Sequence, residues 1–501
     1  MTTYHLRSAS PAKTRSDVVV VGAEQSGKEV RLATGAEDVA EAYGRKLRPL
    51  LSTLGFTGKP GEIVKLPTGG TISSPLLVIV GLGDSPGHVA IRRAAGAAAR
   101  AISNASSVAL ALPADTPERV RAVTEGFDLG AYTFTMYKHN GTKDSAGKGA
   151  NTVSVLTPVA RQQAAVTAMD EALLVAQAVR DARDWVNLPA SDLRPPEFAD
   201  AVQEAGKKLG RGVKISMKVF DEDKLAELGC GGILGVGQGS SAPPRMVELT
   251  YDPKDAVAHI ALVGKGVTYD SGGLSIKPAS GMTTMKCDMA GAAAVVQATF
   301  AIAKLGLPVK ISAFAPMAEN MVSGSSMRPG DVITQYGGTT IEVMNTDAEG
   351  RLILADAIVR AAELQPDVIL DVATLTGHMV IALGDRVAGV LGSDDVVGAV
   401  LAASETAGEA MWPMPIPDAI VDRVKASKIA DLLQHDGIRW GGGLFAAAYL
   451  REFTAGLPWA HLDIAGPAFN TGGPFGHVTS GGTGYAVATL VDYARSLVDV
   501  S

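Results

Sequence analysis

Short apolar runs alternate with longer helix-like segments along most of this chain, and that alternation limits its fold more than any other feature of the sequence. Apolar runs of strand length, bounded by turn residues, predict buried strands, and the segments between them predict helices on the faces of a sheet. In the first third we therefore predict a small mixed or parallel sheet covered by helices. The predicted strands are 16–23, 76–81, 107–112 and 153–157, and the predicted helices are about 88–102 and 117–127.

The remainder of the chain repeats this pattern as a larger unit, and a long helical segment that ends before Pro189 is the predicted junction. The polar, glycine-rich stretch Lys138–Asn151 predicts an exposed loop. The expected fold class is α/β, with a small N-terminal α/β domain (1–161), a linking helix (162–186) and a larger C-terminal α/β domain (187–501) with a central mixed β-sheet flanked by helices. In that larger domain the predicted strands are 260–263, 368–372 and 459–464, and the predicted helices are about 197–209, 289–305 and 351–364.

Composition excludes several classes of function. The 501 residues carry a formal net charge of −7, so no bulk basic field favours nucleic acid, and an obligate nucleic-acid binder is not expected. Only two cysteines are present, which excludes a disulfide framework and favours a cytoplasmic protein. The N-terminal residues lack the apolar core of a signal peptide, and the longest apolar stretches fall short of a membrane span, so no membrane partner is expected.

The first group of residues suited to chemistry follows the strand predicted at 260–263. The stretch KGVTYDSGGLSIKP (Lys265–Pro278) alternates acidic and basic residues with glycine, so that backbone and side chains can crowd around one centre. Asp288 comes eleven residues after Lys277, where a helix begins. The alternative for Asp288 is a helix cap, which stabilises a helix by about 1 kcal/mol.

A second charged stretch, NTDAEGRL, covers Asn345–Leu352. Asp347 and Glu349 are two residues apart, which predicts that both lie on one side of an extended segment, and Gly350 allows a sharp turn before the next helix. Two carboxylates this close repel each other unless a cation lies between them. The alternative is a helix-entry turn whose acidic residues favour the positive end of the helix dipole.

Together with Asp288, the two stretches hold four carboxylates, two lysines and one arginine, a set that suits divalent cations. Carboxylates can bridge two such ions about 3.5–4 Å apart. The sequence has neither cysteines at tetrahedral zinc spacing nor an H-E-x-x-H helix, and its eight histidines are scattered. The glycine run at 235–240 lacks the Lys-Ser/Thr end of a phosphate-binding loop, so we reject a nucleotide-binding function.

These two stretches closely resemble the two motifs of the leucyl aminopeptidase family of cytosolic metallopeptidases. The supporting stretches DVATLTG (371–377) and HLDIAG (461–466) follow in the expected order. The resemblance covers the C-terminal two-thirds of the chain, whereas the N-terminal third matches only in size and βαβ character. It implies a metal-dependent aminopeptidase that removes leucine and other apolar N-terminal residues from peptides through a water bridging two divalent metals. Some members of the family also act as DNA-binding accessory proteins, which is the alternative function.

The resemblance assigns five charged residues to two metal ions. A lysine ligand must be a neutral amine, so its pKa must fall well below about 10.4, and adjacent divalent cations supply that drive. The alternative for Lys265 is an ion pair with Asp270. By the family pattern, one ion is held by Lys265, Asp270, Asp288 and Glu349, and the other by Asp270, Asp347 and Glu349; the ions are zinc or manganese, with magnesium as a further candidate.

Two more charged residues receive catalytic roles from the resemblance. Lys277 would help to polarise the scissile carbonyl and stabilise the developing oxyanion. Arg351 is not a proton acceptor, since the pKa of arginine exceeds about 12, but in the family it holds a bicarbonate ion that serves as general base. The alternative for Arg351 is an ion pair with Asp356 or Glu349 at the helix N-terminus.

The resemblance also implies a specificity pocket and an assembly. The pocket residues are small or apolar, which suits a medium apolar side chain such as leucine. The family typically forms a hexamer of two stacked trimers whose active sites face an inner cavity that admits only short peptides. The implied pocket residues are Met285, Thr374, Gly377, Ala465 and Ala468, and the residues implied to contact the peptide backbone are Asn345 and Leu375.

Overall fold

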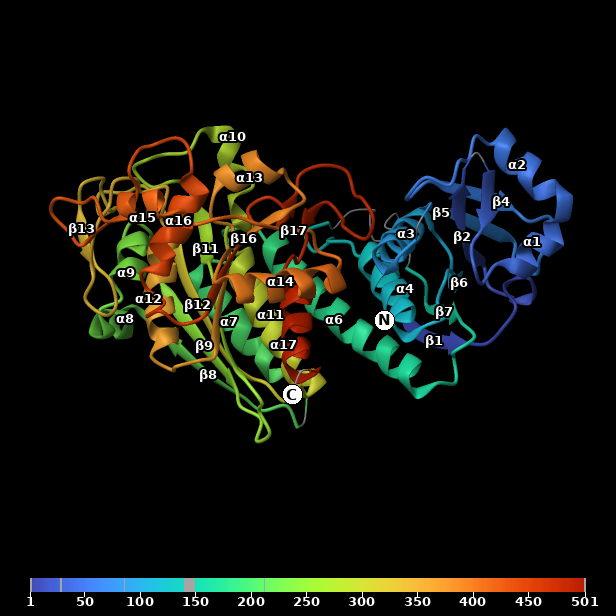
Figure 1. Ribbon diagram of the computed structural model, residues 1–501, viewed down its shortest axis with the longest axis horizontal. Coiled ribbons are helices and arrows are strands. Elements are labelled where there is room, and N and C mark those ends of the chain that lie inside the picture. Colours follow the sequence, from blue (N-terminus) through green and yellow to red (C-terminus); the bar gives the residue numbers. More distant parts are fainter. Residues whose placement is uncertain (1, 28, 85, 139–148, 211, 500–501) are drawn as a thin grey trace. The chain divides into compact units, whose positions relative to one another are not determined.

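The computed structural model describes residues 2–27, 29–84, 86–138, 149–210 and 212–499 (Figure 1). The chain divides into two compact units, Met1–Gln177 with Gly472–Ser480, and Ala178–Thr471 with Gly481–Ser501. The division falls inside helix α6 (Gln163–Asn187), where the sequence predicts a long helix. Most of the loop predicted at Lys138–Asn151 lies outside the described residues.

The first unit contains a mixed sheet with a parallel centre, in agreement with the sequence. Strand β2 lies between β5 and β6 and runs parallel to both, whereas β4 pairs antiparallel with β5. The described strands follow the order β1-β7-β6-β2-β5-β4, with β3 beside β2. Their bounds are β1 (Thr3–Arg7), β2 (Val18–Ser26), β3 (Glu29–Leu32), β4 (Ile63–Pro67), β5 (Leu76–Gly83), β6 (Ser107–Ala111) and β7 (Thr152–Leu156).

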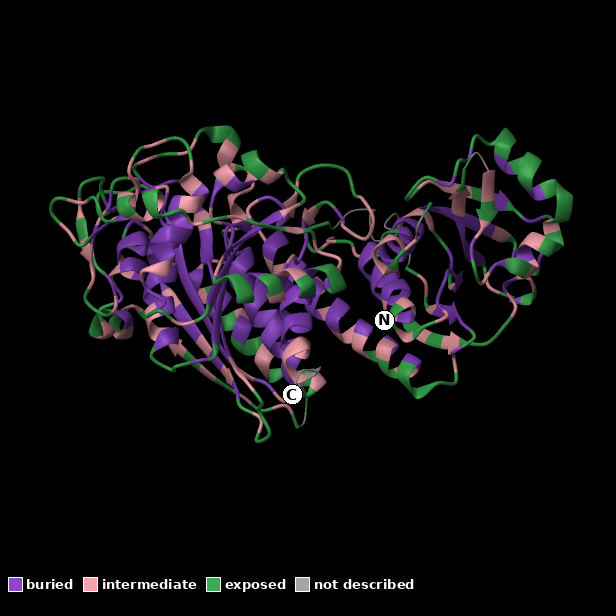
Figure 2. Cartoon of the chain, in the orientation of Figure 1, coloured by how far each residue is buried: buried purple, intermediate pink, exposed green. Residues whose placement is uncertain are grey.

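The run of four valines in β2 has a simple physical cause, because both faces of this strand are covered (Figure 2). Val18 and Val20 belong to one apolar core, whereas Val19 and Val21 belong to a second core. Successive strand residues point to opposite faces, so a strand buried on both faces must be apolar at every position. The helices of this unit are α1 (Glu37–Tyr43), α2 (Leu47–Thr53), α3 (His88–Ala101) and α4 (Pro117–Gly130), with short 3-10 turns at Pro11–Lys13 and Gly44–Lys46.

The second unit is built on a larger mixed sheet. Strand β10 runs parallel to β12 and β15, and β19 runs parallel to β15, which confirms the three strands predicted here. The described strands follow the order β17-β16-β19-β15-β10-β12-β9-β8, with β11 beside β12. Their bounds are β8 (Ile215–Phe220), β9 (Arg245–Tyr251), β10 (His259–Gly264), β11 (Gly266–Asp270), β12 (Lys310–Asn320), β15 (Val368–Ala373), β16 (Ala388–Gly392), β17 (Met411–Pro413) and β19 (Trp459–Asp463).

Helices cover both faces of this sheet, as expected for the fold class. In Figure 1, α11 and α17 lie on one face, and α9, α12 and α16 lie on the other. Short strands complete the unit: β13 (Val332–Thr334), β14 (Thr340–Glu342), β18 (Leu432–Leu433), β20 (Phe469–Asn470) and β21 (Gly481–Gly482). The helices are α7 (Pro195–Lys207), α8 (Glu222–Leu228), α9 (Gly231–Gly237), α10 (Ala279–Met282), η3 (Met285–Cys287), α11 (Ala290–Leu305), α12 (Gly350–Ala362), α13 (Gly377–Leu383), α14 (Asp394–Ala407), α15 (Asp418–Val424), α16 (Gly442–Arg451) and α17 (Val487–Asp499).

One helical stretch corrects the expectation that every apolar segment is shorter than a membrane span. Met285–Leu305 is long enough and apolar enough to span a membrane, with a mean hydropathy of 1.2. However, 89% of its apolar window is buried inside the protein, which is typical of a core helix. α11 lies within this stretch and packs against β10, β12 and β15, so its apolar surface already has partners.

Candidate active site

The carboxyl ends of neighbouring strands bring the first motif together. Lys265 directly follows β10, Asp270 ends β11, and Asn320 ends β12, which lies beside both strands. In open α/β sheets, ligands bind at this edge, outside the carboxyl ends of the strands. The side-chain amide of Asn320 donates a hydrogen bond of 2.8 Å from Nδ2 to Asp270 Oδ1, so the end of β12 fixes the carboxylate at the end of β11.

The second motif forms a turn, and the extended segment expected for Asp347 and Glu349 is therefore wrong. The Asp347 amide donates to Asn345 Oδ1 at 2.9 Å, and the Ala348 amide donates to the Asn345 carbonyl at 3.1 Å. Asparagine side chains favour turns because they bond to the backbone two residues further on. Glu349 has helical backbone angles and directly precedes α12. The observed conformation is thus the alternative one, a helix-entry turn.

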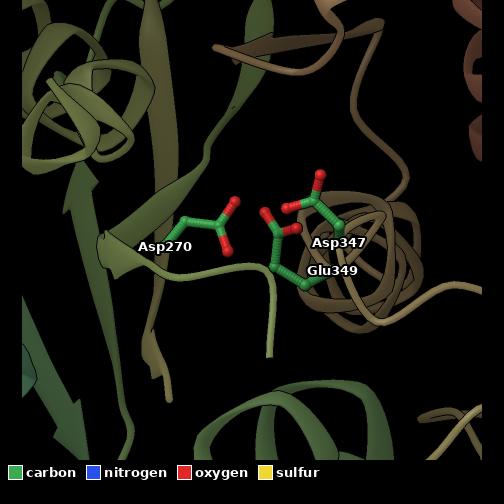
Figure 3. A group of neighbouring side chains, drawn as sticks. All are labelled: Asp270, Asp347 and Glu349. Carbon is green, nitrogen blue, oxygen red and sulfur yellow. The ribbon is translucent and has the colours of Figure 1, made fainter. Parts of the chain in front are cut away.

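Three carboxylates from these two motifs converge on one centre (Figure 3). One carboxylate oxygen from each of Asp270, Asp347 and Glu349 lies within 4.8 Å of the other two. Asp270 and Glu349 are buried, whereas Asp347 is partly open to solvent. Three anionic groups at this separation repel one another strongly, so the arrangement needs positive charge nearby.

Two lysine ammonium groups lie among these carboxylates. Lys277 Nζ is 2.9 Å from Asp270 Oδ2 and 2.6 Å from Asp347 Oδ1. Lys265 Nζ is 2.8 Å from Glu349 Oε1 and 2.8 Å from Asp288 Oδ1. The ion pair that the sequence offered as an alternative, between Lys265 and Asp270, is thus replaced by pairs with other carboxylates.

Asp288 faces this cluster, and the alternative role as a helix cap is wrong. The N-cap residue of α11 is Met289, and no side-chain hydrogen bond caps that helix. Asp288 Oδ1 instead accepts a hydrogen bond of 2.8 Å from the Thr374 hydroxyl, and the Thr374 carbonyl accepts one of 2.9 Å from Lys265 Nζ. The fourth predicted carboxylate therefore belongs to the same centre as the other three.

Burial and crowding shift the pKa values of these groups strongly. Burial, followed by the charge of Glu349, raises the pKa of Asp270 to about 7. Burial raises the pKa of Asp288 well above its usual range. Burial alone would lower the pKa of Lys265, but the carboxylates of Asp288 and Glu349 hold it above its usual value. Further positive charge in the cluster would favour the ionised form of every carboxyl group.

A buried oxygen atom without a partner indicates that this group of carboxylates and lysines fits divalent cations. Asp288 Oδ2 is buried and has no hydrogen-bond partner among the described residues. A buried carboxylate oxygen without a partner is costly unless a cation or donor meets it. Carboxylates together with one amine match the preferences of zinc and manganese, and oxygen ligands suit magnesium.

Arg351 lies at the start of α12, buried to 5% exposure beside the carboxylate cluster. Its Nη1 donates to the Gln434 carbonyl at 2.9 Å, and its Nε is buried without a hydrogen-bond partner among the described residues. Of the two alternative partners, Asp356 instead accepts hydrogen bonds from the Ile233 and Tyr336 amides, and Glu349 pairs with Lys265. Burial lowers the pKa of Arg351 to about 10, so the guanidinium remains a cation and can receive a small anion.

Gly350 serves a different purpose from the sharp turn expected of it. It is the first residue of α12, and its φ is not in the left-handed region. A Cβ atom at this position would lie 2.5 Å from Lys265 Cε and 2.7 Å from Lys265 Nζ. A Cβ atom here would therefore displace the Lys265 side chain, which passes directly over the helix start on its way to Glu349.

The residues implied for the substrate pocket and the peptide backbone lie in four segments of the same unit. Met285 begins η3, and Ala465 and Ala468 follow β19. The remaining ones follow β15 or occupy the turn before α12. Ala468 and Thr374 are buried, Gly377 is exposed, and Met285, Asn345, Leu375 and Ala465 are intermediate.

Sequence reasoning missed three buried side chains that hold these connections. Asn320 binds Asp270, as described above. Asp463 accepts hydrogen bonds from the Thr376 hydroxyl at 2.8 Å and from the Leu375 and Ala465 amides at 3.2 Å each. Gln434 binds the turn before α12. Asn320 and Asp463 lie at the ends of buried strands, and a polar residue at such an end is a sequence signal that could have identified them. No comparable signal marks Gln434 in the sequence.

Comparisons with known proteins identify the family of this chain. The profile described as "Cytosol aminopeptidase family, catalytic domain" matches residues 180–491, and that of the family's N-terminal domain matches residues 20–141. A "Probable cytosol aminopeptidase" of Streptomyces avermitilis is 48% identical over 511 residues, which covers 99% of this chain and 98% of the relative. Another, from Rhodococcus opacus, is 47% identical over 492 residues, which covers 96% of this chain and 95% of the relative.

A solved structure extends the likeness to three dimensions. The bottromycin maturation enzyme BotP, in complex with Mn, has a TM-score of 0.83 to this chain at 40% sequence identity, covering 96% of this chain and 99% of that one. The N-terminal third, which the motifs did not reach, is included in this match. The chain therefore belongs to the cytosol aminopeptidase family, whose members are metal-dependent aminopeptidases that use two metal ions.

Proposed function

We propose that this aminopeptidase removes leucine and other apolar N-terminal residues from peptides, using a water shared by two divalent metal ions. The observation that carries the proposal is the convergence of four carboxylates and two lysines at one strand edge, with Asp288 Oδ2 buried and without a partner among the described residues. When bound, a pair of divalent ions polarises the scissile carbonyl and lowers the pKa of a water between them.

Five side chains of this cluster are the proposed metal ligands, in two overlapping sets. Lys265 and Asp288 would belong to one ion only, because they lie together on the Glu349 side of the cluster. Asp347 would belong to the other ion only, since it lies beside Lys277 at the more exposed end. Asp270 and Glu349 would serve both ions. We propose zinc or manganese as the metal, with magnesium as a further candidate.

Lys277 and Arg351 are the proposed catalytic residues. Lys277 contacts the Asp270 and Asp347 carboxylates, so its ammonium group is close to the proposed metal ligands and would stabilise negative charge on the scissile carbonyl oxygen. Arg351 has an unpartnered buried Nε and would hold a bicarbonate ion, which supplies a general base that the guanidinium itself cannot provide. The proposed role of Arg351 is to hold and orient that anion.

Substrate preference rests on the residues around this centre. Met285, Thr374, Gly377, Ala465 and Ala468 are the proposed side-chain pocket, and their small or apolar character supports leucine. Asn345 and Leu375 are the proposed contacts to the peptide backbone. A free α-amine would bind at one metal, which restricts cleavage to the N-terminal residue.

The test of this function is the dependence of activity on metal. Purified protein should hold about two divalent ions per chain, as a dinuclear site requires. Chelation should abolish hydrolysis of leucine amide, and zinc or manganese added back one at a time should restore it, with a panel of aminoacyl amides measuring the residue preference. Activity that survives complete removal of metal would contradict the proposal, and a preference for charged amides would contradict the assigned pocket.

Metal uptake should release protons, and metal affinity should fall as the pH is lowered. Lys265 ligates only as a neutral amine, and Asp270 and Asp288 ligate only as carboxylates, although burial raises the pKa of both carboxyl groups. Protons therefore compete with metal for the same atoms, and the affinity should decline as the pH falls, more steeply below about 7, the pKa of Asp270. Calorimetry in buffers of different ionisation enthalpy measures the protons released, and binding without proton release near neutral pH would rule out this ligand set.

We further propose a cytoplasmic homohexamer that acts on peptides. The second unit exposes several large apolar side chains, among them Ile381 (85% exposed) and Trp440 (76% exposed), which a subunit interface would cover. Light scattering should give six times the chain mass of 51.5 kDa. A monomer mass in dilute buffer at physiological salt would contradict this assembly.

A further inference from the structure

The Gln434 side chain is completely buried and makes four hydrogen bonds to one short segment of backbone. Gln434 Oε1 accepts from the Met344 and Asn345 amides, each at 3.1 Å. Gln434 Nε2 donates to the Asn345 carbonyl at 2.6 Å and to the Ala348 carbonyl at 2.9 Å. A carboxamide offers two acceptor sites and two N–H donors, so this side chain is used to its full capacity.

The segment held in this way, Met344–Ala348, is the turn that presents Asp347. The Gln434 backbone extends the same arrangement, because its amide donates to the Glu342 carbonyl at 3.0 Å and its carbonyl accepts from Arg351 Nη1 at 2.9 Å. One residue therefore contacts the strand that enters the turn, the turn itself and the first arginine of α12.

We propose that Gln434 is a positioning residue of this aminopeptidase, which sets the location of Asp347 and the orientation of Arg351 for the proposed second metal ion and its anion. The inference rests on the proposed function, since the metal role of Asp347 is itself a proposal. Gln434 lies 86 to 90 positions from the turn residues that its side chain bonds. The turn therefore depends on a distant part of the chain as well as on its own Asn345.

The two metal positions should respond differently to loss of this carboxamide. Asp347 is the one proposed ligand carried by the Met344–Ala348 turn, whereas Lys265 and Asp288 are held by the ends of β10 and η3 and by Thr374. Residues that orient metal ligands typically change metal affinity by about 10–100-fold when they are replaced. A general structural role would instead weaken both ions together.

The experiment is a calorimetric Mn²⁺ titration of the full-length, metal-depleted protein and its Gln434→Met variant. Methionine keeps the length of the side chain and removes all four hydrogen bonds without adding charge. The ion class that Asp347→Asn removes should bind about 10–100-fold more weakly in Gln434→Met, while the other class keeps nearly its wild-type affinity. The matched control is Gln335→Met, which replaces another buried glutamine, one that donates to the Tyr449 hydroxyl and does not contact the turn.

The possible outcomes distinguish a failure of this inference from a failure of the proposed function. If wild-type protein binds fewer than two ions, the proposed function fails and the inference fails with it. If wild type binds two ions but Gln434→Met weakens both equally or neither, Gln434 is structural and only the inference fails. Should Gln434→Met not fold, Gln434→Asn carries the test, because it keeps the amide but withdraws it by one methylene group, and the same selective weakening is expected at smaller magnitude.

Discussion

Replacing Lys277 with alanine is expected to lower kcat by about 10²–10³-fold while both metal ions stay bound. The Lys277 ammonium lies 2.9 Å from Asp270 and 2.6 Å from Asp347, so it is a cation beside two proposed metal ligands. Its removal takes away a group that would stabilise negative charge on the carbonyl oxygen. Because an ammonium also competes with metal for the same carboxylates, metal affinity should stay the same or rise. Steady-state kinetics on leucine amide and a metal titration measure the two effects separately.

Two further variants serve as comparisons for the Lys277→Ala prediction. Asp347→Asn removes a proposed ligand, so metal content and kcat should fall together. Lys310→Ala removes an ammonium at the opposite end of β12, where it pairs with Asp252 at 3.6 Å, and should leave both quantities unchanged. The assigned roles are wrong if Lys277→Ala keeps wild-type turnover, or if it loses metal to the same extent as Asp347→Asn.

The parts of the fold that the sequence predicts are those where burial on both faces leaves a continuous apolar run. Val18–Val21 in β2 is one such run, and Ile260–Val263 in β10 is another. β12 is buried along nearly all of its length but contains Pro316, Glu319 and Asn320, which are unusual inside a central strand. Its polar end is explained by partners that only the tertiary structure supplies, such as Arg194 for Glu319 and Asp270 for Asn320.

In the candidate site too, some features follow from residues that are close in the sequence, and others depend on residues that are far apart in it. The charged residues of the two motifs are concentrated enough in the sequence to be identified as one centre, and the structure brings them together. The conformation around Asp347 was not predictable from a spacing of two, because Asn345 bonds to its amide and Gln434 holds the same turn from far along the chain. Spacing identifies which residues act together, but the hydrogen bonds of the backbone decide where they point.

Gly350 shows how a local interpretation can identify the right residue for the wrong reason. A glycine before a helix suggests a turn with unusual backbone angles. Here the backbone of Gly350 is helical, and what matters is the missing Cβ atom, whose place is filled by the Lys265 side chain. The conflict with Lys265 arises from tertiary packing. Helix propensity alone predicts that alanine in place of Gly350 stabilises the protein, whereas this contact predicts that it destabilises the protein.

Gly350→Ala is expected to lower kcat/KM by about 10²-fold or more and to weaken metal binding at the Lys265 position. The added methyl group would lie 2.5 Å from Lys265 Cε, well inside van der Waals contact. Lys265 is buried and its Nζ is held by Asp288, Glu349 and the Thr374 carbonyl, so it cannot move aside without leaving those partners. Overpacking of this kind typically costs about 1–3 kcal/mol of stability.

The matched control for this prediction is Gly398→Ala in α14. Gly398 is exposed within its helix, and a Cβ atom there would meet nothing within 4 Å. Because alanine favours a helix over glycine by about 0.5–1 kcal/mol, this control should be slightly stabilised, with unchanged activity. Thermal unfolding, metal titration and kinetics on both variants measure the difference. If Gly350→Ala behaves like Gly398→Ala, then the close contact with Lys265 does not govern the position of that amine, and its proposed role as a metal ligand loses its structural basis.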